Sequence, residues 1–202
     1  MNAQYSPRIT EVEALNILLS AIGASPITKT DNPQNVDAIN ARDALIQATR
    51  EIQAERWYFN TEENYPLTPD SRTEEITVPT NIISIDHIGR FGQRPQFAIR
   101  GSRLYDLFRH TYKFKHPIHL NVHLSLEFDE MPETAKQYAI ARAARKFQET
   151  MLGDPNLRTW TREDEAFARA HLMDEHLRAQ KTFFGVFPKA DPAAAMDFRD
   201  ID

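Results

Sequence analysis

The sequence predicts an α+β fold in which two pairs of helices frame an inserted antiparallel β domain. Apolar residues recur at helical spacing over about residues 10–57 and again over about residues 132–181. Between these regions, residues 60–128 contain short strand-like runs separated by turn residues. The clearest run, residues 118–128, alternates apolar and polar side chains without interruption. We therefore expect the outer helix pairs to pack as one four-helix bundle, from which the β domain projects.

The expected domain boundaries follow these changes of pattern. Residues 1–59 and 129–182 would form a discontinuous helical bundle, residues 60–128 a β-rich insert, and residues 183–202 an extended C-terminal tail. The tail is rich in aromatic residues, and apolar groups in a terminal segment indicate docking to a partner. The candidate docking residues are Phe183, Phe184, Phe187 and Phe198.

The ends of the first two helices have sequence signals. Thr10 and Glu13 have the spacing of a capping box, which predicts that a helix begins after Thr10, and Gly23 predicts its end. Pro33 suits the first turn of a second helix. Its expected apolar line is Val36, Ile39, Leu45, Ala48 and Ile52.

Turn residues place the later elements. Gly101 and Ser102 separate two short apolar runs and predict a β-hairpin. A third helix is expected from Pro132 to Gly153, and a last helix over about residues 156–181. The expected apolar face of the last helix is Trp160, Phe167, Ala170, Met173 and Leu177.

Composition excludes several classes of function. The chain has 202 residues, a net charge of −5 and no cysteine, so disulfides, thiolate metal sites and cysteine nucleophiles are excluded. No apolar run approaches the roughly 20 residues that cross a bilayer. The N-terminus lacks the basic and then apolar pattern of a signal peptide. We therefore expect no membrane anchor, and synthesis in a cytoplasm.

One stretch, residues 119–133, combines two histidines with four carboxylates. His119 and His123 would lie roughly 13 Å apart on a strand, whereas one metal ion needs both ring nitrogens about 2 Å away. The pair therefore predicts a solvated strand face and no metal site. Asp129, Glu130 and Glu133 suit the start of a helix, where carboxylates interact favourably with the helix dipole.

Two alternatives from other functional classes stay open at this point. Paired carboxylates among Asp129, Glu130 and Glu133 could serve a hydrolase that cleaves polysaccharide. The basic cluster Arg142, Arg145 and Lys146 could bind DNA, although a negative net charge argues against affinity from phosphate neutralisation. No nucleophile, phosphate-binding or dinucleotide-binding motif is present, so no cofactor and no catalytic residue is assigned.

Two short motifs carry a family resemblance. Residues 57–70, WYFNTEENYPLTPD, match a W-x-F-N-x-E-E pattern through Trp57, Phe59, Asn60, Glu62 and Glu63. Residues 129–133, DEMPE, match a helix opening through Asp129, Glu130, Met131, Pro132 and Glu133, followed by Arg145, Phe147 and the terminal Gly153. In this order and spacing, the motifs resemble tail tubular protein A of T7-like podoviruses over about residues 10–180. The chain after Lys181 departs from the pattern.

The resemblance implies a structural virion protein without enzymatic activity, the head-to-tail adaptor or connector of the viral tail. It implies a dodecameric ring of identical copies, although the isolated chain can remain a monomer. The implied partners are the portal protein, the tail nozzle (tubular protein B) and a tail fibre. Genomic double-stranded DNA would pass through the lumen during ejection without being held tightly. The particle would be assembled in the cytoplasm of the bacterial host.

Overall fold

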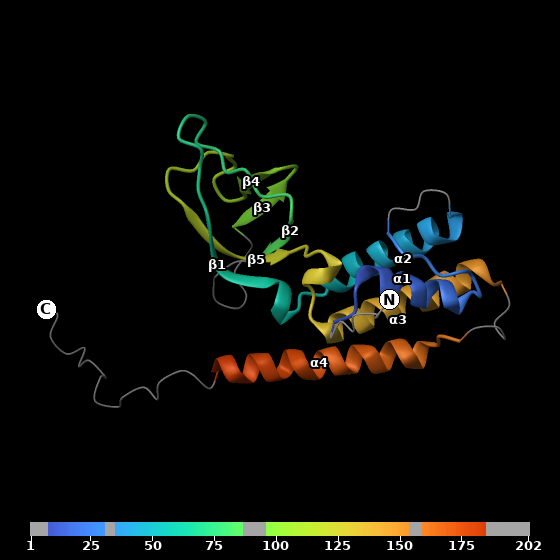
Figure 1. Ribbon diagram of the computed structural model, residues 1–202. Coiled ribbons are helices and arrows are strands. Elements are labelled where there is room, and N and C mark those ends of the chain that lie inside the picture. Colours follow the sequence, from blue (N-terminus) through green and yellow to red (C-terminus); the bar gives the residue numbers. More distant parts are fainter. Residues whose placement is uncertain (1–7, 31–34, 87–95, 154–158, 185–202) are drawn as a thin grey trace, which may run out of the picture.

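The computed structural model describes residues 8–30, 35–86, 96–153 and 159–184, and it is an α+β fold (Figure 1). The strands gather at one end of the molecule and the helices at the other, with α4 running beneath α3. The helices are α1 (Glu11–Ala21), α2 (Val36–Gln53), α3 (Glu133–Met151) and α4 (Arg162–Phe184), with short 3₁₀ turns η1 (Tyr58–Asn60) and η2 (Phe128–Glu130). The strands are β1 (Thr61–Leu67), β2 (Ile82–Asp86), β3 (Phe97–Arg100), β4 (Arg103–Asp106) and β5 (Ile118–Leu124).

Helix α3 is the centre of the helical part. It contacts α1, α2 and α4, while α4 packs mainly against α3 and η1. Its sequence supplies small side chains on several sides, so neighbouring helices approach closely and bury ten of its 19 residues. The core around it includes Leu15, Leu45, Tyr138, Phe147 and Leu172.

The β part has a separate core beneath two small antiparallel sheets. Strand β5 lies between β1 and β2 in a three-stranded sheet, and β3 pairs with β4 in a hairpin. The predicted turn at Gly101 and Ser102 is confirmed, because Arg100 pairs with Arg103 across it. The side chains of this core are Leu67, Ile76, Val78, Ile82, Leu104, Phe114, Leu120 and Val122.

The predicted ends of α1 are confirmed, but the predicted start of α2 is wrong. Thr10 and Glu13 form the reciprocal capping box, and Gly23 adopts a φ of +73° after the helix. Helix α2 begins at Val36 with Asn35 as its cap, and Pro33 lies outside the described residues. Two residues of the expected apolar line, Val36 and Ile39, are exposed because the buried side of α2 runs through its alanines and Leu45 instead.

Strand β5 is shorter than the alternation predicted, since it ends at Leu124 and not at residue 128. His123, which was expected on the solvent-exposed face of this strand, is buried. Beyond Leu124 the chain leaves the sheet. The side-chain amide of Gln53 hydrogen-bonds both backbone groups of Leu126: its Nε2 donates to the carbonyl at 3.0 Å, and its Oε1 accepts the N–H at 2.6 Å. The helical part thus replaces a neighbouring strand as the hydrogen-bond partner.

Helix α4 begins later than predicted, and the expected apolar face is confirmed only in part, since Trp160 and Met173 pack partly buried against the helical core but Ala170 is exposed. It starts at Arg162, where Thr161 and Asp164 cap it reciprocally, and its backbone continues through Phe184. Leu172 is fully buried, whereas Phe167 and Leu177, expected on the buried face, are 66% and 46% exposed. Among the described residues, no helix has the length and apolar character that crossing a bilayer requires.

Candidate functional site

The first family motif forms the junction between the helices and the strands. The backbone N–H of Trp57 donates to Asn60 Oδ1, and Asn60 Nδ2 donates to the carbonyls of Gln53 and Leu124, each at 2.9 Å. The indole side chain of Trp57 is buried, and its Nε1–H donates to the carbonyl of Ile52. One asparagine side chain therefore joins the end of α2, the 3₁₀ turn η1 and the end of β5.

The remaining residues of this motif have different surroundings. Phe59 packs, partly buried, against the helical core, and its ring meets Tyr58 edge to face at 5.8 Å. Glu62 and Glu63 are exposed on β1, the edge strand of the three-stranded sheet. Trp57, Phe59 and Asn60 thus meet at the junction, while the two glutamates face solvent.

A buried histidine lies next to the junction, and sequence reasoning placed it on a solvated face. His123 Nε2 lies 3.0 Å from Asp86 Oδ2, and its Nδ1 lies 3.0 Å from Thr61 Oγ1. The hydroxyl of Thr61 donates to the carbonyl of Trp57, so it faces the ring as an acceptor. Arg56 pairs with Asp86 at 2.7 Å and completes the cluster.

The second motif, DEMPE, forms the corner before α3. Glu130 accepts the backbone N–H of Glu127, and Glu133 accepts the backbone N–H of Ile9 at 3.3 Å. Met131 is buried in the helical core, and Pro132 is the residue before the first turn of α3. Glu130 thus closes the 3₁₀ turn η2 and Glu133 lies in the first turn of α3, but no side chain caps that helix.

Lys136 is a residue at this corner that sequence reasoning missed. Its side chain is only 2% exposed, its Nζ donates to the carbonyl of Ile9 at 3.0 Å, and Asp129 lies 4.0 Å away. Lys136 shares a helical stripe with Ile140, Ala143 and Phe147, all buried. That spacing was the available signal that the lysine points inward.

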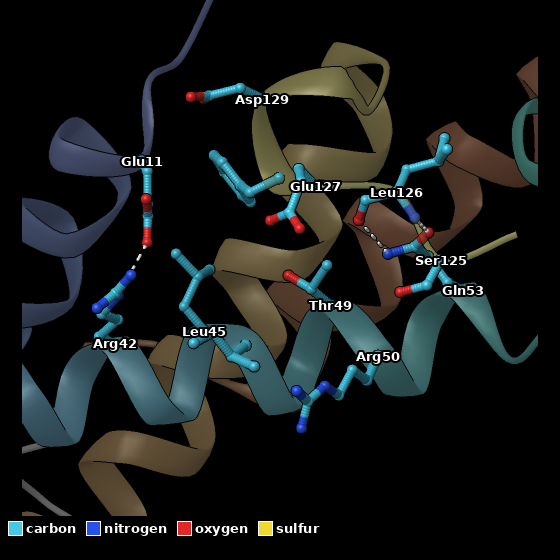
Figure 2. Close-up of a pocket in the computed structure, with 12 residues that line it drawn as sticks. Glu11, Arg42, Leu45, Thr49, Arg50, Gln53, Ser125, Leu126, Glu127 and Asp129 are labelled. Carbon is cyan, nitrogen blue, oxygen red and sulfur yellow. Dashed lines mark hydrogen bonds and ion pairs between the residues drawn. The ribbon is translucent and has the colours of Figure 1, made fainter. Parts of the chain in front are cut away.

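A cleft of about 240 Å³ opens beside the same corner (Figure 2). Glu127 and Asp129 line it from the turn, and Glu11 lines it from α1, paired with Arg42 at 3.4 Å. Of the three carboxylates considered for a glycan hydrolase, only Asp129 lines this cleft. The described residues therefore do not bring the proposed acid pairs together here, and they contain no cluster of three His, Cys, Asp or Glu side chains that could hold a metal ion.

The basic cluster considered for DNA binding is held in ion pairs. Arg142 meets Glu165 at 2.8 Å and Glu55 at 3.0 Å, Arg145 meets Glu165 at 2.6 Å, and Lys146 meets Glu51 at 2.6 Å. Burial opposes ionisation of Glu165, but hydrogen bonds from the two arginines outweigh it and lower the pKa of this carboxyl. The cluster joins α2, α3 and α4, and its charge is neutralised within the chain.

The last motif residues and the tail complete the placement. Phe147 is in the helical core, and Gly153, with a φ of +66°, ends α3 in the left-handed conformation that glycine adopts easily. The backbone of Phe183 and Phe184 continues α4, but their side chains lie outside the described residues. Phe187 and Phe198 also lie outside them, so tail docking stays a prediction.

The similarity to known proteins extends over both the helical and the β part of the chain. A sequence model of the family described as tail tubular protein matches residues 12–182. The chain belongs to the tail tubular protein family. Tail tubular protein A of Klebsiella phage KP34 is 30% identical over 172 residues, which cover 85% of this chain and 89% of that relative. Family membership makes the chain a structural protein of a phage tail, and the match ends before the aromatic tail.

Proposed function

We propose that the chain is the ring-forming head-to-tail adaptor of a podovirus, acting without catalytic turnover. In this role, identical copies form a dodecameric ring between the portal and the tail nozzle, with a tail fibre attached nearby. The lumen of the ring is part of the DNA ejection channel. The ring is assembled in the host cytoplasm and remains in the virion tail.

The observation that carries this proposal is the outer face of α4. This 23-residue helix buries one line of side chains through Leu172 against α3, and the opposite side displays Phe167 and Leu177 to solvent. Val36 and Ile39 are exposed on α2 in the same way. Two different apolar surfaces on one chain suit a heterologous contact, which generates a ring when its rotation closes.

The finer domain arrangement belongs to the same proposal. The separate helical and β cores support a helical bundle of residues 1–59 and 129–182 with a β insert of residues 60–128. Ion pairs from α4 reach the turn that follows α2 as well as α3, since Arg169 meets Glu55 at 3.3 Å and Glu165 meets Arg142 at 2.8 Å. We infer that the four helices act as one bundle, with residues 183–202 as the partner-binding tail.

The proposal is tested by mixing the purified chain with portal and nozzle proteins and imaging the complexes by electron microscopy. Phe167→Asp is expected to leave the fold intact, because the side chain is exposed, but to prevent ring closure. Phe108→Asp makes the same chemical change at an exposed turn of the β part and is expected to retain the ring. Wild-type chain that joins neither partner, or rings that form equally well with Phe167→Asp, would contradict the proposal.

A further inference from the structure

The β3–β4 hairpin and the segment after it carry positive charge that the ion-pair network does not use. Residues 96–119 contain five lysines and arginines and a single aspartate, although the whole chain has a net charge of −5. That aspartate, Asp106, is buried, and its carboxylate accepts the backbone N–H groups of Phe108 and Arg109 at 2.8 Å. The outside of this region is therefore basic within an acidic protein.

The strand register collects the charge on one face of the hairpin. Arg100 is directly opposite Arg103, and Ala98 is opposite Tyr105, so these side chains share a face. Leu104 points the other way and is fully buried in the β core. Lys113 lies beside this face, because its backbone forms an antiparallel β-bridge with that of Glu75, whose carboxylate binds Arg103.

Aromatic rings are stacked between the cations of this face. The guanidinium of Arg100 lies 3.8 Å from the ring centroid of Tyr105, and that of Arg103 lies 4.3 Å from Tyr112. The two tyrosine rings meet at 4.7 Å. We define the basic–aromatic face as Arg100, Arg103, Tyr105, Tyr112 and Lys113.

Part of this charge is not neutralised by the chain. Arg103 donates to both oxygens of Glu75, at 2.9 Å and 3.0 Å. Within the described residues, neither Arg100 nor Lys113 has a carboxylate within ion-pair distance. A stacked guanidinium keeps the N–H groups at its edge available for an acceptor. The face thus offers preoriented donors beside two partly buried tyrosine rings.

We propose that the basic–aromatic face binds the phosphate backbone of a nucleic acid. Arginine stacked on aromatic rings suits phosphate and nucleic-acid recognition, and cations interleaved with rings are typical of surfaces that follow a strand without reading its sequence. Two or three phosphate contacts give a weak, salt-sensitive interaction, which does not hold a passing strand in place. This inference is independent of ring formation, because it concerns the isolated chain.

The experiment measures fluorescence anisotropy of labelled single-stranded and duplex DNA of about 20 nucleotides per strand, titrated with the purified chain. Affinity is compared at salt concentrations from about 50 to about 200 mM. The double variant Arg100→Gln, Lys113→Gln is expected to bind more weakly. Its loss of duplex affinity over this salt range should be about 10-fold smaller than that of the wild type, because two fewer phosphates are neutralised.

Two further variants separate charge from stacking and from position. Arg100→Lys keeps the charge but loses the planar stacked group, so binding should weaken several-fold with an unchanged salt dependence. The control Lys29→Gln, Arg162→Gln removes two exposed charges from the helical part and should bind DNA as the wild type does. The proposal is overturned if the wild type does not bind at about 50 mM salt, or if the control loses as much affinity as the double variant. Displacement of DNA by polyglutamate at equal charge would also overturn it, in favour of an acidic polypeptide partner.

Discussion

Replacing Asn60 by alanine is expected to weaken the junction between the helices and the strands more than any other single polar substitution there. The side chain of Asn60 is 1% exposed and makes three hydrogen bonds of 2.9 Å. Its partners are backbone groups of Trp57, Gln53 and Leu124, which belong to three different elements. Alanine removes all three bonds. The carbonyl of Gln53 still accepts the backbone N–H of Arg56 at 3.2 Å, whereas the buried N–H of Trp57 loses its acceptor.

The size of the effect follows from the burial of those groups. A buried backbone donor or acceptor left unpaired costs about 1–3 kcal/mol, and a partly buried bond contributes about 0.5–1.5 kcal/mol. Two of the three bonds of Asn60 are buried and the third, to Leu124, is partly buried. With one buried group, the N–H of Trp57, left unpaired and two further bonds lost, we expect the free energy of unfolding to fall by about 3 kcal/mol, within a range of about 2–6 kcal/mol.

The assay is urea unfolding followed by far-UV circular dichroism and by tryptophan fluorescence, to which Trp57 at the junction and Trp160 both contribute. The control is Asn40→Ala, which removes an exposed asparagine from α2 and should change stability by less than about 0.5 kcal/mol. If Asn60→Ala costs less than about 1 kcal/mol, the three backbone groups find other partners and Asn60 does not join the two parts.

Two further predictions concern the docking of α4. Leu172→Ala should lower the free energy of unfolding by about 2–5 kcal/mol, because the side chain is fully buried. Leu177→Ala, at a side chain that is 46% exposed, should lower it by less than about 0.5 kcal/mol in the same assay. Equal losses would refute the observed orientation of α4. The lowered pKa of Glu165 implies a stabilising contribution that is complete above the ordinary value of 4.5 and is lost as the pH falls through the lowered value. Glu165→Gln should therefore destabilise the chain at neutral pH by about 1–3 kcal/mol and reduce the loss of stability on acidification. An identical dependence on pH in both proteins would show that the pairs with Arg142 and Arg145 contribute nothing.

Local signals were sufficient wherever neighbouring residues determine the conformation. The capping box at Thr10, the left-handed Gly23 and the hairpin turn at Gly101 all depend on contacts within a few residues, and all three are present. The α+β class follows from the change of apolar period along the chain, which is also a local property.

The prediction for α4 failed for a different reason. Apolar residues occur on more than one side of this helix, so periodicity alone does not tell which side is buried. The ion pairs of Glu165 and the burial of Leu172 orient α4 against α3, and this leaves Phe167 outside. Both the ion pairs and the burial of Leu172 involve residues that are distant from α4 in the sequence.

The candidate site shows the same division. The motif residues Trp57 and Asn60 were identified from the sequence, but their shared role needs Leu124, which lies 64 residues beyond Asn60. The alternation of the strand placed His123 on the solvent-exposed face. In the structure its ring is buried and lies 3.0 Å from both Asp86 and Thr61.

The sequence by itself determined the succession of helical, β-rich and helical regions, the capping box of α1, the turn at Gly101, and membership of a structural family of phage tails. Only the tertiary structure decided which sides of α2 and α4 stay exposed, where β5 ends, and which arginines are neutralised. The physical reason is that caps and turns form between neighbours in the chain, whereas burial and ion pairing depend on which residues, distant in sequence, pack against the element. The basic–aromatic face belongs to the second group, because Arg100 and Tyr112 become parts of one surface only when the hairpin folds.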